Sequence, residues 1–360
     1  MQFNSKKGIE MADVENKEDN TNSEAALESQ EIIIDKGQEP TRIDKFLKNR
    51  LFRITRNKLQ TAIREGSITV DGERVKPNFK LKPGHKVSIT LPRYQSDNVV
   101  QPQNIPLDIH YEDEDLLLVN KPPGLVVHPG IGNPDGTLVN GLMHYLKMDA
   151  VEAEGINYQE KIGLVHRIDK DTSGLLIVAK NDYALSFLAK QFFDHTIERT
   201  YYALVWGQPE PEKGKVDAHI GRHPRYRELF TTFPEGDQGK WAVTHYEVIE
   251  PMYYVSLIKC NLETGRTHQI RVHMKHLGHT LFNDKRYGGD HILKGTIYSR
   301  YKHFVEQTFS VMPRHALHAK SLGFIHPRTE EFMQFETDLP KDFSDALLSW
   351  RTYLNDKKNV

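Results

Sequence analysis

Apolar residues recur at helical spacing in two segments near the start of the chain, TRIDKFLKNRL (41–51) and TRNKLQTAIREG (55–66). Spacings of three and four residues place such side chains on one face of a helix. Thr41 and Thr55 stand as N-caps, and Gly66 ends the second segment. The pattern predicts two consecutive amphipathic helices, with these apolar positions facing a core: Ile43, Phe46, Leu47, Leu51, Leu59, Ala62 and Ile63.

Strand patterns follow directly. SITVDGERV (67–75) is predicted to form two short strands around Asp71-Gly72, because Asp-Gly is a strong signal for a tight hairpin turn. LKPGHKVSITLP (81–92) adds a turn at Pro83-Gly84 and a further strand.

From residue 108 onward strand-like and helix-like patterns are mixed. Strands are predicted in 115–130 (a strand, a loop at Pro122, Pro123 and Gly124, then a short strand), 174–180, 199–207, 240–250, 253–264, 315–327 and 331–340. Helices are predicted in 137–146, 182–193, 267–278 and 341–354. Consecutive strands joined by short turns indicate an α+β fold with a mixed, largely antiparallel central sheet flanked by helices.

Charge divides the chain more sharply than its net charge of −1 suggests. Residues 1–40 carry four lysines against ten acidic residues, are poor in aromatics, and are expected to form a disordered acidic tail. Residues 41–93 carry fourteen Lys and Arg against four acidic residues, and such a segment favours a polyanionic partner over a merely solvated surface. Residues 94–107, rich in Pro, Gln and Asn, are expected to be a linker before a domain at 108–354.

Composition excludes several classes of protein. The single cysteine, Cys260, excludes an internal disulfide framework and a thiolate metal cluster, and it favours a cytoplasmic protein. No run has the apolar length of a membrane span, and the first residues do not read as a signal peptide. The sequence also lacks a Walker A loop and a G-x-G-x-x-G motif.

The stretch LVHRIDKDTSGLLIVAK (164–180) contains more charge than a turn requires. Asp171, with the Thr, Ser and Gly that follow it, already supplies turn chemistry. Arg167 and Asp169 are surplus to that need, so Asp169 is a candidate for chemistry rather than for turn formation.

Two later segments also place polar residues on otherwise apolar elements. In ERTYYALVWG (198–207), Tyr201 and Tyr202 must point to opposite faces of a strand. In LETGRTHQIRVHMKHLGH (262–279), Arg266, Arg271 and Lys275 flank a predicted helix. The same segment also carries histidines spaced by three, but no carboxylate stands at metalloprotease spacing, so a zinc site is disfavoured. The histidines are His273, His276 and His279.

The order of two helices, an Asp-Gly hairpin and a final strand in 41–93 resembles the small αL-type RNA-binding domain of the ribosomal protein S-four type. TRIDKFL and ITVDGERVKPNFKLKPGHKVSI carry the resemblance. It implies that structured RNA is held by shape and phosphate contacts rather than by reading bases. The candidate RNA-binding residues are Arg42, Lys45, Arg53, Arg56, Lys58, Arg64, Arg74 and Lys76.

The rest of the chain resembles the RluA/RluD branch of the pseudouridine synthases, which modify ribosomal and transfer RNA. The resemblance covers most of 108–326 in the family's order. Its most specific strings are H-R-x-D-x-x-T-S-G and G-R-T-H-Q-I-R, with Ile168 where many members have Leu. The matching stretches are LLLVNKPPGLVVHP, LVHRIDKDTSGLLIVAK, ERTYYALVWG, KWAVTHYEV, LETGRTHQIRVHMKHLGH and RHALHAKSLGFIHP.

The resemblance implies the pseudouridine synthase fold and an isomerase that needs no cofactor or metal. It implies that Asp169 is the nucleophile, with Arg271 as its guanidinium partner and Arg266 as the fallback. Tyr201 would be the active-site tyrosine, stacking on uracil and acting in late proton removal. Arg167 would fill the gap left by a flipped uridine or hold its phosphate. Arg266 and His166 complete the expected substrate-binding residues.

Large-subunit ribosomal RNA, free or in a pre-ribosomal particle, is the expected partner, and no membrane partner is expected. Transfer RNA remains an alternative substrate, since the same motifs serve both. A non-catalytic ribosome-assembly factor would explain the basic domain but not Asp169, Tyr201 and Arg271. A metal-dependent RNA hydrolase would need clustered carboxylates, or the histidine triplet with a fourth ligand. The target uridines and the oligomeric state stay open.

Overall fold

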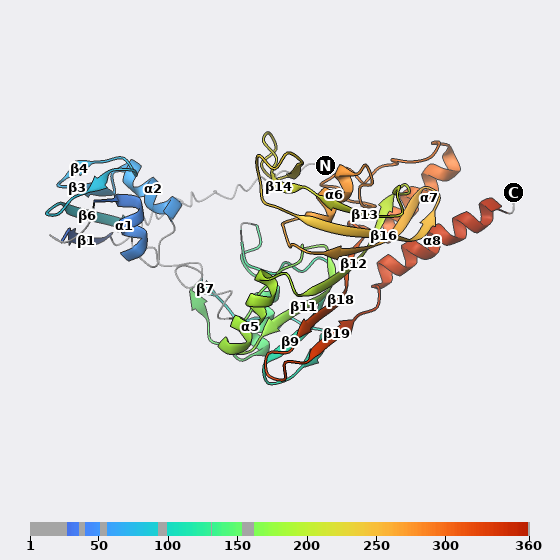
Figure 1. Ribbon diagram of the computed structural model, residues 1–360, viewed down its shortest axis with the longest axis horizontal. Helices are drawn as coiled ribbons and strands as arrows, with labels where there is room; N and C mark the ends of the chain where they lie inside the picture. The colour runs from blue at the N-terminus through green and yellow to red at the C-terminus, as the bar shows by residue number, and fades with distance from the viewer. Residues whose placement is uncertain are drawn as a thin grey trace, which may run out of the picture. The chain divides into compact units, whose positions relative to one another are not determined.

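The computed structural model divides the chain into two compact units, Met1–Asp97 and Asn98–Val360 (Figure 1). Each unit has its own hydrophobic core. No helix among the described residues is long and apolar enough to cross a bilayer. The described residues are 27–35, 40–50, 56–92, 99–130, 132–152 and 162–358.

The first unit packs two helices against a four-stranded sheet of order β1-β6-β3-β4. The two predicted helices are confirmed as α1 (Ile43–Arg50) and α2 (Arg56–Glu65). The predicted hairpin is also confirmed, with left-handed backbone at Asp71 (φ 51°) and Gly72 (φ 82°), as its tight turn requires. The strands of this sheet are β1 (Leu27–Ile33), β3 (Ile68–Val70), β4 (Glu73–Arg74) and β6 (Lys86–Pro92). Strands β2 (Thr41–Arg42) and β5 (Lys80–Leu81) form a separate antiparallel pair.

Strand β1 corrects the expectation of a disordered tail over 1–40. Residues Leu27–Ile33 pair antiparallel with β6, and Ile34 is buried behind them. The prediction is wrong for these residues because ladder hydrogen bonds use backbone groups, which an acidic composition does not remove. Glu31 also lies 2.7 Å from the Lys86 ammonium on the basic partner strand. Residues 1–26 and 36–39 lie outside the described residues.

The second unit is built on a nine-stranded sheet in the order β13-β16-β17-β12-β18-β11-β9-β8, with β19 paired to β18. Every pair is antiparallel except β11 with β18, so the predicted mixed, largely antiparallel sheet is confirmed. Its strands are β8 (Ile109–Glu112), β9 (Leu116–Lys121), β11 (Ser173–Ala179), β12 (Glu198–Trp206), β13 (Lys213–Asp217), β16 (Val243–Met252), β17 (Val255–Leu262), β18 (Leu317–Ile325) and β19 (Phe332–Glu336). Two smaller pairs are β7 (Val99–Val100) with β10 (Val151–Glu152) and β14 (His219–Arg222) with β15 (Phe230–Phe233).

Helices flank this sheet (Figure 1). The predicted helices are confirmed as α3 (Leu138–Tyr145), α5 (Asp182–Phe193), α6 (Gln269–His276) and α8 (Lys341–Lys358). Helix α7 (Ser299–Val311) was not predicted; Tyr301, Val305 and Thr308 line its buried face. The short strand expected after Gly124 does not form. Its carbonyls have other partners: Leu125 accepts from the Lys121 ammonium, and Val126 and Val127 accept from the first amides of α3.

The expected linker at 94–107 is shorter in the structure. Residues 99–107 belong to the second unit, where the Asn140 side chain donates to Gln101 and the Gln103 amide donates to the Asn140 carbonyl. Ile105 and Leu107 lie against Gly141, where a Cβ would approach them at 3.1 and 3.2 Å.

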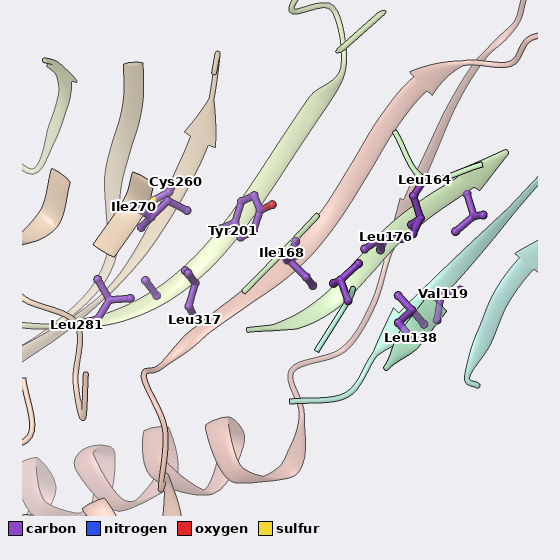
Figure 2. Close-up of a cluster of buried hydrophobic side chains, with 14 of the residues drawn as sticks. Val119, Leu138, Leu164, Ile168, Leu176, Tyr201, Cys260, Ile270, Leu281 and Leu317 are labelled. Carbon is purple, nitrogen blue, oxygen red and sulfur yellow. The ribbon is translucent and has the colours of Figure 1, made fainter. Parts of the chain in front are cut away.

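The sheet separates two cores, and Tyr201 and Tyr202 confirm the predicted opposition. Tyr201 packs with Ile168, Ile270 and Leu317 on one face (Figure 2). Tyr202 packs on the other face, in the cluster that contains Trp206 and Trp350. Strand β12 therefore presents Tyr201 on the face toward which the 166–172 loop and α6 turn.

Candidate active site

Hydrogen bonds fix both ends of the loop 166–172, which carries Asp169. At its start the imidazole Nε2 of His166 accepts the Ile177 amide of β11 at 3.0 Å. At its end the Thr172 amide donates to the Asp169 carbonyl, and the Thr172 hydroxyl contacts the His315 ring at 2.9 Å. Gly174 follows at φ 111°, and a Cβ there would lie 2.2 Å from the Ala319 carbonyl oxygen. Only glycine lets the chain approach β18 this closely, so the loop is fixed relative to the sheet.

A buried lysine supports the same loop from below. Lys121, fully buried at the end of β9, donates to the carbonyls of Pro122, Leu125 and Lys170 at 2.8–2.9 Å. Burial lowers the pKa of Lys121 to about 7. The bond to Lys170 ties the NKPPG segment to the residue after Asp169, a supporting role that the sequence reasoning missed.

Asp169 forms an ion pair with Arg271 of α6. The Arg271 Nη1 donates to the Asp169 Oδ2 at 2.9 Å, so the predicted pairing is present and the fallback Arg266 is not the partner. The Asp284 carboxylate accepts two further hydrogen bonds from the same guanidinium, from Nε at 2.7 Å and from Nη2 at 2.9 Å. The guanidinium also lies over the ring of Tyr287, with Cζ 4.9 Å from its centroid. Arg271 thus bridges two carboxylates, one in the cavity and one behind it.

Asp169 stays ionised although its side chain is only partly exposed. Burial is the largest influence and raises its pKa, but charges on His268, Arg271 and His315 outweigh burial and lower the pKa overall. Burial lowers the pKa of His268 to about 4 and that of His315 to about 3, so both rings are neutral near pH 7. Arg271 is therefore the cation that keeps the carboxylate charged at neutral pH.

A cavity of about 270 Å³ opens beside this pair. Tyr201, 8% exposed, forms part of its wall, and burial raises the pKa of its phenol. The predicted substrate-binding residues His166, Arg167 and Arg266 line the same cavity. The full lining is Val165, His166, Arg167, Ile168, Asp169, Thr172, Phe192, His195, Arg199, Tyr201, Leu262, Gly265, Arg266, His268, Gln269, Ile270, Arg271 and Leu317.

Each predicted substrate-binding residue has a distinct setting. Arg167 is exposed. Arg266 is half-buried and donates from Nε to the Trp241 carbonyl at 2.9 Å. His166 stacks on Phe192, with centroids 4.6 Å apart, and burial lowers its pKa to about 3.

Other residues of the site were not identified from the sequence. Asp284 accepts from Arg271, and His268 Nε2 lies 4.0 Å from the Asp169 carboxylate. Arg199 contributes a buried guanidinium to the cavity wall. Arg199 stands two positions before Tyr201 on a strand, and that alternation was the signal that could have revealed it.

The histidines considered for zinc do not converge. His273 contacts the Thr244 hydroxyl and the Ala218 carbonyl, His276 contacts the Thr232 hydroxyl, and His279 contacts the Trp206 carbonyl. Asp113, Asp115 and His326 do lie close together among the described residues, but Arg328 occupies both oxygens of Asp115, at 2.6 and 2.8 Å.

The candidate RNA-binding residues of the first unit differ in availability. Lys45, Arg64, Arg74 and Lys76 are exposed. Arg42 is engaged by the buried Asp44, with two hydrogen bonds of 3.0 Å, and so has a structural function. Arg56 and Lys58 lie on α2, whereas Arg53 lies outside the described residues.

Comparison with known proteins agrees with this arrangement. The RNA pseudouridylate synthase family model matches residues 115–276, and the S4 domain model matches 41–87. An uncharacterized RNA pseudouridine synthase of Chlorobaculum parvum is 42% identical over 90% of this chain and 98% of its own length. The ribosomal large subunit pseudouridine synthase D of Zymomonas mobilis is 44% identical, over 84% and 91% respectively. The solved structure of human RNA pseudouridylate synthase domain containing 4 shares the fold, with TM-score 0.50 and 24% identity over 68% of this chain and 92% of that one.

Proposed function

Because this chain belongs to the RNA pseudouridylate synthase family and is therefore an isomerase, we propose that it converts specific uridines of large-subunit ribosomal RNA to pseudouridine, with Asp169 as the nucleophile. One observation carries the assignment of Asp169. Its carboxylate lies in the cavity 2.9 Å from the Arg271 guanidinium and shares that cavity with Tyr201.

The proposed reaction rearranges bonds within one nucleotide. The bond between uracil N1 and ribose C1′ breaks, and a bond between uracil C5 and C1′ forms. The proton leaves C5, and N1 gains one, so substrate and product are isomers. An ionised carboxylate serves attack on ribose, attack on uracil, or proton removal from the sugar.

Tyr201 is proposed to stack its ring on the uracil. The raised pKa keeps its phenol protonated in the free enzyme, so a role as proton acceptor would first require that proton to leave. Stacking needs no change of charge, and Tyr201 lines the same wall as Asp169.

The target base must leave its helical stack to reach a cavity of this kind. We assign to the exposed Arg167, next to Ile168 in the loop, the filling of the gap that the base leaves. His166 shapes the wall, since its Nε2 is already bonded to the Ile177 amide. Arg266 contributes a cation to the cavity lining.

The first unit is proposed to hold the RNA by its phosphates. Lys45, Arg64, Arg74 and Lys76 are exposed, and opposing acids in this segment are few. Arg56 and Lys58, which lie on α2, are proposed to contribute to RNA binding as well.

The choice of ribosomal RNA is supported by relatives named ribosomal large subunit pseudouridine synthase D in Zymomonas mobilis and Nitrosomonas europaea. Mapping of pseudouridines in cellular RNA, with and without the gene, tests it. Sites in large-subunit ribosomal RNA should disappear on deletion, return with the wild-type gene and stay absent with Asp169→Asn. If only pseudouridines in transfer RNA disappear, transfer RNA rather than ribosomal RNA is the substrate. An unchanged map would favour a non-catalytic assembly factor.

A further inference from the structure

We propose that Arg199, together with Arg266, binds a phosphate of the nucleotide whose base enters the cavity. This inference rests on the proposed function, because it names how the same cavity holds a nucleotide. It assigns an anion-binding subsite to a residue that neither the sequence motifs nor the ion pair of Asp169 accounts for.

Arg199 is a buried cation without a carboxylate partner among the described residues. The residue is 6% exposed, and its Nη2 donates to the carbonyls of Leu262 at 3.4 Å and Glu263 at 3.0 Å. Its Nε has no hydrogen-bond partner within the described part of the chain. Two carbonyls do not neutralise a guanidinium, and a buried charge is costly until an opposite charge meets it.

The Nη1 atom of Arg199 lies beside the cavity lining. Arg199 and Tyr201, alternate residues of β12, both line it. Nη1 lies beneath Gly265, where an added Cβ would stand 2.8 Å away, and Gly265 lines the cavity as well. Gly265 has no positive φ, so a side chain added there would act through its contact with Nη1 rather than through backbone strain.

A second guanidinium stands beside the first. Arg266 follows Gly265, lines the cavity and lowers the pKa of Arg199, after the larger lowering by burial. Two neighbouring cations repel each other, and a shared anion relieves that repulsion.

The charge balance of the cavity identifies the ligand as a phosphate rather than a base carbonyl. Its lining holds the cations Arg167, Arg199, Arg266 and Arg271, whereas Asp169 is its only carboxylate among the residues that the structure describes, and Arg271 pairs with it. A uracil oxygen is neutral and would leave this excess of positive charge without an anion. A phosphodiester, which every RNA nucleotide carries, offsets it and accepts hydrogen bonds from a guanidinium fork.

Binding of mononucleotides to the full chain tests this without any catalytic turnover. Uridine, uridine 5′-monophosphate and uridine 3′-monophosphate are titrated by ligand-observed NMR against wild type, Arg199→Lys and Arg199→Gln. Arg351→Gln is the control for loss of one cation, since Arg351 pairs with Glu250 and does not line the cavity. Thermal unfolding shows that each variant is folded.

Wild type should bind at least one monophosphate about 10-fold more tightly than uridine, as one charge-assisted hydrogen bond provides. Arg199→Gln should abolish that preference, Arg199→Lys should keep part of it, and Arg351→Gln should keep all of it. No preference in wild type, or an equal preference in wild type and Arg199→Gln, overturns the proposal. Equal loss of uridine and monophosphate binding in Arg199→Gln would assign Arg199 to the base instead and also overturns it.

A second measurement uses a stem-loop of ribosomal RNA that the wild-type enzyme converts, with an uncharged methylphosphonate on either side of the target uridine. The neutral linkage should raise the wild-type KM about 10-fold and leave the KM of Arg199→Gln nearly unchanged. Equal penalties in both enzymes refute the subsite. Failure of wild type to convert any ribosomal RNA refutes the proposed substrate and leaves the mononucleotide result standing.

Discussion

Asp284 binds the guanidinium of Arg271 through two hydrogen bonds, of 2.7 and 2.9 Å, on the edge formed by Nε and Nη2. This arrangement leaves Nη1 directed at Asp169, 2.9 Å away. Both Arg271 and Asp284 are buried, so the orientation is set by a pair that solvent barely reaches. The charge and the direction of the proposed nucleophile therefore depend on a carboxylate outside the cavity lining.

Asp284→Asn should lower kcat roughly 100-fold while RNA affinity holds, because Arg271 loses its fixed orientation. Removal of one partner from a buried ion pair should also cost about 3 kcal/mol of stability. Asp115→Asn is the matched control, since it breaks a bidentate interaction with Arg328 that does not line the cavity. Steady-state kinetics and thermal unfolding separate the two effects. Equal kcat losses in both variants would mean that Asp284 acts only on stability.

Asp169→Asn and Asp171→Asn compare two carboxylates of one loop. Both remove one negative charge and keep the shape of the side chain, and Asn supports turns nearly as well as Asp. Asp169→Asn should reduce pseudouridine formation by orders of magnitude, with RNA binding retained, whereas Asp171→Asn should cost little. Pseudouridine assays on a ribosomal RNA transcript, with filter binding alongside, measure both. An active Asp169→Asn enzyme would refute the proposed nucleophile.

Arg271→Leu should move the acid limb of the rate profile to higher pH. In wild type the pKa of Asp169 is lowered below its ordinary value, so the carboxylate stays ionised, and kcat/KM level, from about pH 8 to about pH 5. Without Arg271, one of the charges that offset burial is lost, so that pKa should rise, and protonation should reduce the remaining activity within this range. The control is Arg351→Gln, which should keep the wild-type profile. If the acid limb does not shift in Arg271→Leu, Arg271 is not the residue that keeps Asp169 ionised.

Stability should fall as pH drops from about 6.5 toward 4. Burial lowers the pKa of His268 to about 4 and that of His166 and His315 to about 3. Between these values and about pH 6.5 the three histidines are protonated in the unfolded chain but neutral in the folded chain. The stability that these neutral histidines contribute is therefore complete above the histidine pKa of the unfolded chain, and it is lost progressively as the pH falls below that value. The depressed pKa of Asp169 adds a loss only at more acid pH. Thermal unfolding against pH measures the slope, and His166→Gln, which can still accept the Ile177 amide, should make it shallower.

Replacement of Lys45, Arg64, Arg74 and Lys76 together by Gln should weaken RNA binding and flatten its salt dependence. For every phosphate that the variant no longer neutralises, the slope of log K against log salt should become shallower by about 0.7–0.9. The matched control replaces four exposed lysines of the second unit by Gln, namely Lys190, Lys213, Lys302 and Lys341. Equal slopes in the two quadruple variants would show that the first unit is not the anchor.

Local patterns were sufficient where an element depends on its own residues. The spacing of Ile43, Phe46 and Leu47 predicted α1, and Asp71-Gly72 predicted its hairpin, because side-chain periodicity and turn chemistry act over a few positions. The opposition of Tyr201 and Tyr202 followed from strand geometry alone. Strand β1 escaped prediction because its stability comes from a partner strand more than fifty residues away.

By itself the sequence determined the two-part organisation, the largely antiparallel sheet and the family, and it singled out Asp169 and Arg271 by long motifs. Only the tertiary structure decided which arginine pairs with Asp169, since 102 positions separate the partners and Arg266 was the alternative. It also decided that Asp284 orients Arg271 and that Arg199 lacks a carboxylate partner among the described residues. The physical reason is that burial and charge pairing depend on distances across the fold, which no local spacing of residues specifies.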